Sequence, residues 1–208
     1  MEGPPFFAHF NNDVVRLLLE NGADIHAVDN NKTTILHNML SNVFIAPETI
    51  QMTLDQGVNV NARDKDGQTP LHALATTRTY SFLPSFLPAA TGQFMTKYGE
   101  TLSYILRMLM DVEINLDAQD RKRNTALHLL HFNKTAEAIM EQGANVLIRN
   151  NKNRTPFEHL RSISKSGNYV EPKLLALMEK WHNSAAVKNE LEKKTGLYSK
   201  VQKKPSRM

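Results

Sequence analysis

The 208-residue sequence contains no cysteine. Disulfide bonds, a thiol nucleophile and a cysteine-ligated metal are therefore excluded, and the protein does not require an oxidising compartment. Long apolar runs are also missing: none approaches the roughly 18 residues of a membrane-spanning helix, so we expect no membrane span. The N-terminus, MEGPPFFAHFNND, lacks the basic region and apolar segment of a signal peptide. We therefore predict a cytoplasmic or nuclear protein.

Recognisable catalytic signatures are absent as well. The sequence shows no Gly-rich phosphate loop, no Ser-His-Asp arrangement and no spacing typical of metal ligands. We accordingly expect no enzyme activity, no catalytic residue, no metal site and no cofactor. One enzyme alternative stays open, a site within the aromatic insertion described below; turnover of any compound in a broad substrate panel would support it.

Basic residues are concentrated at the C-terminus. From Val187 onward the sequence holds seven lysines and arginines and two glutamates, a net charge of +5, so the remainder carries −1 of the total of +4. The alkaline pI therefore belongs to this end of the chain. We expect residues 187–208 to form a disordered basic tail. Open alternatives are a nuclear-import stretch, contact with nucleic acid or anionic lipid, and a C-terminal translocation signal.

What the sequence does contain is one stretch that occurs four times. The copies begin at Gly22, Gly57, Glu113 and Gly143. In each copy a threonine follows its first residue by 12 positions, at Thr34, Thr69, Thr125 and Thr155. A fixed interval with variable filler indicates that each copy fits the same gap between neighbours in a stacked array.

The residues of these copies resemble the ankyrin repeat, whose period is about 33 residues. The resemblance is carried by Gly-Ala-Asp-Ile at 22–25, Asn-Ala-Arg-Asp at 61–64 and Thr-Pro-Leu-His at 69–72, and it extends over residues 10–180. It implies an all-α solenoid of stacked helix-turn-helix pairs with projecting β-hairpin loops. We expect about five repeats within residues 1–186.

The spacing between copies predicts irregular repeats. From the threonine to the residue opening the next copy there are 23 positions in the second repeat, 44 in the third and 18 in the fourth. The third repeat thus carries an insertion at about residues 78–100, which should leave the array opposite the hairpin tips. Its aromatic residues are candidate binding contacts, or else they fold back and fill the repeat: Tyr80, Phe82, Phe86, Phe94 and Tyr98.

Histidine recurs three residues after the threonine, at His37, His72 and His128. A shared metal is not expected, because equivalent positions lie about 10 Å apart per helix layer, against about 2 Å for a metal–nitrogen bond. The resemblance implies that the Thr and His hydrogen-bond within and between repeats. The fourth copy has Glu158 instead, which we expect to weaken the network at the C-terminal end.

Aspartates gather in the predicted hairpins, at Asp29, Asp64, Asp66, Asp117 and Asp120. Acid–base chemistry is one interpretation of such carboxylates. We favour a structural role, because Asp and Asn side chains stabilise turns by accepting hydrogen bonds from nearby backbone N–H groups.

The third and fourth hairpin tips are basic. Because neighbouring tips lie side by side, we expect one patch that steers an acidic partner surface, or alternatively a solvated rim that keeps the array soluble. Its six residues are Arg121, Lys122, Arg123, Arg149, Lys152 and Arg154.

We therefore predict a non-catalytic module, monomeric when free, that presents the hairpin tips and inner helices to a protein partner. Proteins of this kind include effectors that some intracellular bacteria deliver into host cells without a signal peptide, which is one interpretation of this chain. The alternative function is a nucleic-acid-associated regulator that uses the basic tail and tips, and it predicts a steep loss of affinity with salt. A protein partner is the preferred interpretation.

Overall fold

The computed structural model describes residues 13–18, 20–42, 46–76, 88–130, 133–168 and 170–195. Residues 13–18 are helical. The named elements are α2 (Ile35–Leu40), α3 (Pro47–Asp55), α4 (Pro70–Thr76), α5 (Pro88–Asp111), the 3-10 turn η2 (Ala126–Leu129), α6 (Asn133–Glu141), α7 (Pro156–Lys165) and α8 (Pro172–Thr195).

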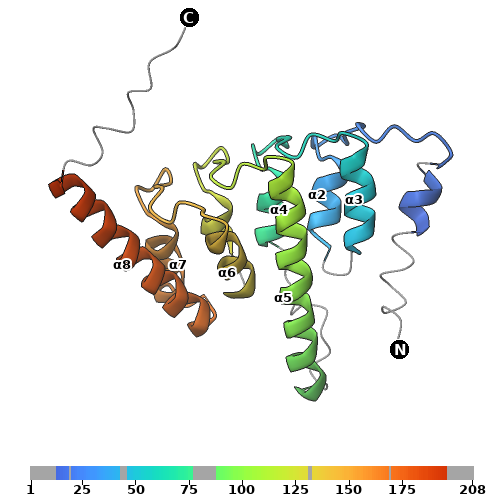
Figure 1. The fold of residues 1–208 in the computed structure, drawn as a ribbon. Coiled ribbons are helices and arrows are strands. Elements are labelled where there is room, and N and C mark those ends of the chain that lie inside the picture. Colours follow the sequence, from blue (N-terminus) through green and yellow to red (C-terminus); the bar gives the residue numbers. More distant parts are fainter. Residues whose placement is uncertain are drawn as a thin grey trace, which may run out of the picture.

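The helices form two layers of an elongated stack (Figure 1). In the inner layer α2 packs against α4, α4 against η2, and η2 against α7. In the outer layer α3 packs against α5, α5 against α6, and α6 against α8. The order of the elements along the stack follows the order along the chain, and the loops that open each inner element line one side of it. A mostly helical repeat fold is thus confirmed.

One apolar position anchors the inner layer. The second residue after each repeated threonine is buried, at Leu36, Leu71, Leu127 and Phe157. Burying a side chain of this size stabilises the fold by about 1.5–3 kcal/mol. The outer layer contributes four fully buried side chains, those of Ile50, Leu106, Ile139 and Met178. Because these side chains form one continuous core between the layers, each inner element is held at a fixed place in the row.

The projecting loops are tight turns rather than the β-hairpins that the sequence predicted. Within the described residues the only strand-like pairing is an isolated bridge between Val28 and Thr34. The first side chain of each turn accepts hydrogen bonds of 2.7–3.2 Å from the backbone N–H groups two and four residues later. These residues are Asp29, Asp64, Asp120 and Asn150. The turn-stabilising role predicted for Asp29, Asp64 and Asp120 is confirmed. These side-chain bonds take the place of the backbone hydrogen bonds that would pair the two strands of a β-hairpin.

Backbone hydrogen bonds join each turn to the next. Lys65 N–H donates to the carbonyl of Asn31 at 2.8 Å, Arg121 N–H to that of Asp66 at 3.0 Å, and Asn151 N–H to that of Lys122 at 3.0 Å. The acceptor always occupies the third position of a turn and the donor the second position of its neighbour. The tips of neighbouring repeats therefore lie side by side, as the sequence predicted.

The irregular spacing appears as irregular element length. Where the sequence is long, α5 has 24 residues against 9 in both α3 and α6. It extends beyond the other outer helices on the side away from the loops (Figure 1). Where the sequence is short, the inner helix is reduced to the four residues of η2. The C-terminal α8 continues to Thr195, so the helix runs past the tail boundary predicted at residue 186.

Candidate functional site

The repeated threonine and histidine form the same set of bonds at three junctions. In each, the histidine Nδ1 lies 3.0–3.2 Å from the threonine backbone nitrogen and 2.8–3.0 Å from its Oγ1. Its Nε2 lies 3.0–3.1 Å from a carbonyl oxygen that precedes the next threonine, at Gln68, Asn124 and Arg154. Because a carbonyl can only accept, Nε2 carries the proton and Nδ1 accepts from the threonine N–H. The predicted bonds within and between repeats are confirmed.

Burial keeps two of these histidines neutral. Burial in the stack is the largest influence on the pKa of His72 and lowers it, against the opposing effect of its bond to the Asn124 carbonyl. Burial likewise lowers the pKa of His128 to about 4. A proton on Nδ1 would face the threonine N–H instead of accepting from it. These side chains therefore act as neutral connectors at physiological pH rather than as acid–base groups.

The third and fourth turns are additionally joined through buried polar side chains. Asn150 Nδ2 donates to Asn124 Oδ1 at 2.9 Å, and Asn124 Nδ2 donates to Asp120 Oδ2 at 3.2 Å. All three residues are buried. Asn151 Nδ2 also donates to the carbonyl of Arg121 at 3.2 Å. The basic tips at these two turns are therefore fixed relative to each other.

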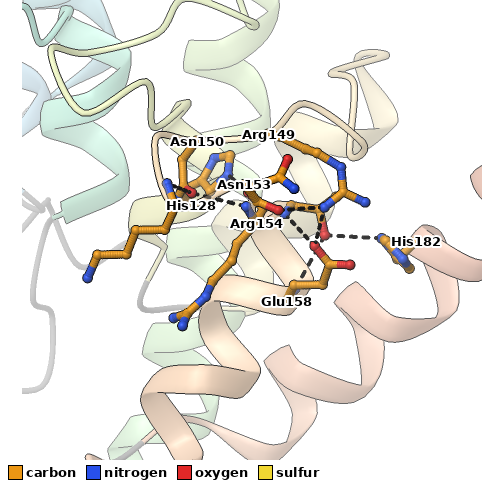
Figure 2. Close-up of polar contacts among 9 residues, drawn as sticks. His128, Arg149, Asn150, Asn153, Arg154, Glu158 and His182 are labelled. Atoms are coloured by element: carbon orange, nitrogen blue, oxygen red, sulfur yellow. Dashed lines mark hydrogen bonds and ion pairs between the residues drawn. The ribbon is translucent and has the colours of Figure 1, made fainter.

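The last junction ends the series with a carboxylate (Figure 2). Glu158 Oε2 accepts from Thr155 N–H at 2.8 Å and from Arg149 Nη1 at 2.9 Å. From α8, His182 Nδ1 lies 3.4 Å from Thr155 Oγ1. Burial raises the pKa of Glu158, but the bonds from Thr155 and the Arg149 charge outweigh it and the pKa is lowered. The glutamate thus keeps the bond to the threonine N–H within the repeat. A carboxylate cannot supply the N–H that the histidines donate to the next repeat.

The structure divides the six basic residues predicted as one patch. Arg121, Lys122, Arg123 and Lys152 are exposed on the paired third and fourth tips. Arg149 instead turns to Glu158 and to the carbonyl of Asn153, at 2.9 and 2.6 Å. Arg154 is half-buried and donates to Ser162 Oγ on α7. Only the first four thus combine exposure with a shared position at the tips, and we call them the tip cations.

The aromatic candidates in the insertion are not placed by the structure. Tyr80, Phe82 and Phe86 lie outside the described residues, and so do the side chains of Phe94 and Tyr98, whose backbones belong to α5. Their binding role stays a prediction.

One structural element escaped the sequence analysis. The residue before each of the last three turns extends a side chain along the row: Arg63 Nη1 donates to the Gln119 carbonyl at 2.7 Å, and Gln119 Nε2 donates to the Arg149 carbonyl at 3.2 Å. Arg149 ends this row at Glu158. Long donors at one repeat position were the signal that could have indicated it. Arg149 therefore has a structural role as the last member of this row, which its charge alone did not indicate.

Two kinds of site are not found in the described part of the chain. No group of three histidine, aspartate or glutamate side chains there could hold a metal ion. No helix among the described residues has the length and apolarity that a bilayer crossing needs.

Part of the chain that contains these junctions matches a known protein family. Residues 6–91 match the family model described as ankyrin repeats, in three copies. Residues 6–91 therefore carry ankyrin repeats. Beyond the matched residues, the threonine N–H again donates to the side chain three residues later, His128 at Thr125 and Glu158 at Thr155. Ankyrin repeats typically serve as protein–protein interaction modules without catalysis, so they support a protein partner for this chain.

The contact between Arg149 and Glu158 should contribute little to stability. Their side chains are 49% and 39% exposed, and exposed ion pairs are worth about 0–1 kcal/mol. In a double-mutant cycle of Arg149→Ala and Glu158→Gln, we expect a coupling energy of about 0.5 kcal/mol from urea unfolding. A coupling well above 1 kcal/mol would show that this pair, rather than the threonine bonds, fixes the last junction.

Proposed function

We propose that this protein is a non-catalytic binding module of five ankyrin repeats, the third enlarged by the insertion at about 78–100. Its array would occupy residues 1–186, with the basic tail beyond. A protein partner would bind across the turn tips and inner helices, with the tip cations as the electrostatic component. The observation that carries this proposal is the bonding between the third and fourth turns, which keeps four exposed cations side by side.

The mechanism is rigid presentation of a preformed surface. The tips are held by bonds within each turn and between turns. A surface already fixed in this way loses little conformational entropy on binding, so moderate contacts give useful affinity. Grouped cations also raise the rate of encounter with an acidic surface.

A pull-down from cell lysate tests the proposal. The tip variant replaces Arg121, Lys122, Arg123 and Lys152 by serine. We expect it to lose a protein that the intact chain captures. A control variant loses the same charge elsewhere, at exposed residues outside the tips: Arg16, Lys173, Lys180 and Lys188. It should retain the partner. Loss of the partner only when residues 80–98 are deleted would assign recognition to the insertion and contradict the tip surface.

The alternative of a nucleic-acid-associated regulator is favoured by the same tip cations together with the basic tail. It predicts that affinity for DNA or RNA falls steeply between low and physiological salt. Capture of polyanions alone, with that salt dependence, would move this alternative ahead. Absent or salt-insensitive binding would remove it.

We also propose a cytoplasmic or nuclear site of action, with delivery into a host cell as a bacterial effector as the finer hypothesis. A reporter enzyme fused to the intact chain, active only in host cytosol, tests delivery. A reporter signal that stays within the bacteria during infection would contradict it.

A further inference from the structure

The side of α7 that faces the end of the array carries charge where upstream helices carry apolar groups. Six residues after the threonine, α2 has Leu40 and α4 has Ala75, each 1% exposed. The equivalent residue of α7 is Arg161, which is exposed. Each of the upstream helices is followed by another inner element, whereas α7 is the last inner helix in the described part of the chain. The outer helix α8 packs on α7, with His182 against Phe157, so the exposed part of the α7 end face is the part around Arg161.

This end face contains a shallow recess lined by Arg154, Glu158, Arg161, Ser162 and Lys165. Arg154 comes from the fourth turn, and its side chain runs along α7, away from Glu158 (Figure 2). Its guanidinium donates to Ser162 Oγ. The guanidinium carbon of Arg161 lies 5.9 Å from the centre of the Phe157 ring, a cation–π geometry that favours one orientation of the side chain. Two of the three cations are thus positioned by contacts within the protein.

The recess carries an excess of positive charge. Its one carboxylate, on Glu158, already accepts from Arg149 and from the Thr155 N–H. Arg154, Arg161 and Lys165 form no ion pair among the described residues. Nearby, the pKa of His159 is lowered, first by burial and then by the charges of Arg154 and Lys152. A group at this end of α7 therefore experiences a positive field, which concentrates anions.

We infer that this recess, called the α7 recess below, binds an acidic segment of the protein partner, whose carboxylates meet Arg154, Arg161 and Lys165. The inference rests on the proposed function and adds to it a second contact, with a stated chemistry. The recess and Lys152 of the tips belong to the same turn and the helix that follows it. A partner on the tips can therefore extend an acidic segment onto α7.

The probe is a fluorescent octaglutamate peptide, with octaglutamine as the uncharged comparison, titrated at an ionic strength of about 0.15 M so that distant charges are screened. The recess variant is Arg161→Gln with Lys165→Gln, and the control variant is Lys173→Gln with Lys180→Gln. All four side chains are exposed, so we expect both variants to fold like the parent chain. We expect the recess variant to raise the Kd for octaglutamate about 10-fold, and the control to change it less than about 2-fold.

NMR titration of His159 provides a second readout. A bound carboxylate offsets the charges of Arg154 and Lys152, so octaglutamate should raise the pKa of His159 in the parent chain. Equal weakening by both variants, equal binding of octaglutamine, or an unchanged His159 titration would overturn the inference. If octaglutamate fails to bind while the tip variant still loses its captured protein, the α7 recess fails and the proposed function stands. If octaglutamate binds selectively and no protein is captured, the α7 recess stands as a site for carboxylates and the proposed function fails.

Discussion

Replacing His72 by alanine is expected to lower the free energy of unfolding by about 3 kcal/mol. The side chain is 1% exposed. It accepts from the Thr69 N–H and donates to the Asn124 carbonyl, at 3.1 and 3.0 Å. Removing it leaves two buried backbone groups without their partner, each costing about 1–3 kcal/mol, and opens a cavity between two repeats. Urea unfolding followed by circular dichroism measures the loss.

His26 offers the matched control. It is an exposed histidine in the first copy, and its backbone rather than its ring contacts Asp24. His26→Ala should change the unfolding free energy by no more than about 0.5 kcal/mol. Similar losses for both variants would mean that the histidine bond between repeats is not a principal source of stability.

Acidification should destabilise the fold most strongly between pH 6.5 and about 4, the ordinary and the folded pKa of His128. In this range the unfolded chain binds a proton on this histidine that the folded chain excludes. Stability is therefore fully present above pH 6.5 and falls as the pH approaches 4. A full shift of this size corresponds to roughly 3 kcal/mol. The lowered pKa values of His72 and His159 act in the same direction.

Urea unfolding at a series of pH values tests this linkage, with His128→Gln as the comparison. The amide oxygen of glutamine can accept from the Thr125 N–H without titrating. We expect the variant to be less stable at pH 7 and its stability to fall less steeply on acidification. Parallel pH profiles for parent and variant would contradict the role given to His128. The lowered pKa of Glu158 contributes only at more acidic pH, where that carboxylate takes up its proton.

The repeated threonine was enough to predict most of the junction geometry. In the structure α2, α4, η2 and α7 each begin at the residue directly after this threonine. The Thr–His bonds followed from the family resemblance, and the aspartate turns followed from the preference of these side chains for nearby N–H groups. The turn bonds and the bonds within a repeat were predictable because they join residues no more than four positions apart. The histidine bonds between repeats join residues 26 to 52 positions apart, and only the family resemblance implied them.

The partners of individual basic side chains were not predictable in the same way. The sequence predicted Arg149 and Arg154 as members of the same patch as the tip cations, because it does not show which basic side chains form hydrogen bonds or ion pairs within the fold. The structure directs Arg149 to Glu158 and Arg154 to Ser162. Arg161 and Lys165 did not stand out in the sequence because they belong to a predicted helix. Their exposure is visible only in the structure, where no inner helix follows α7 among the described residues. The loops, in turn, lack strands because side chains and neighbouring turns take up their N–H groups.

Hydrogen–deuterium exchange of the captured complex tests the central claim, that the tip surface holds the partner. Backbone amides of residues 120–124 and 150–154, with those of α7, should exchange more slowly when the partner is bound, since contact excludes solvent there. Protection confined to α5 or to the outer helices, with these two turns unchanged, would contradict the account and place the partner on the opposite side of the array.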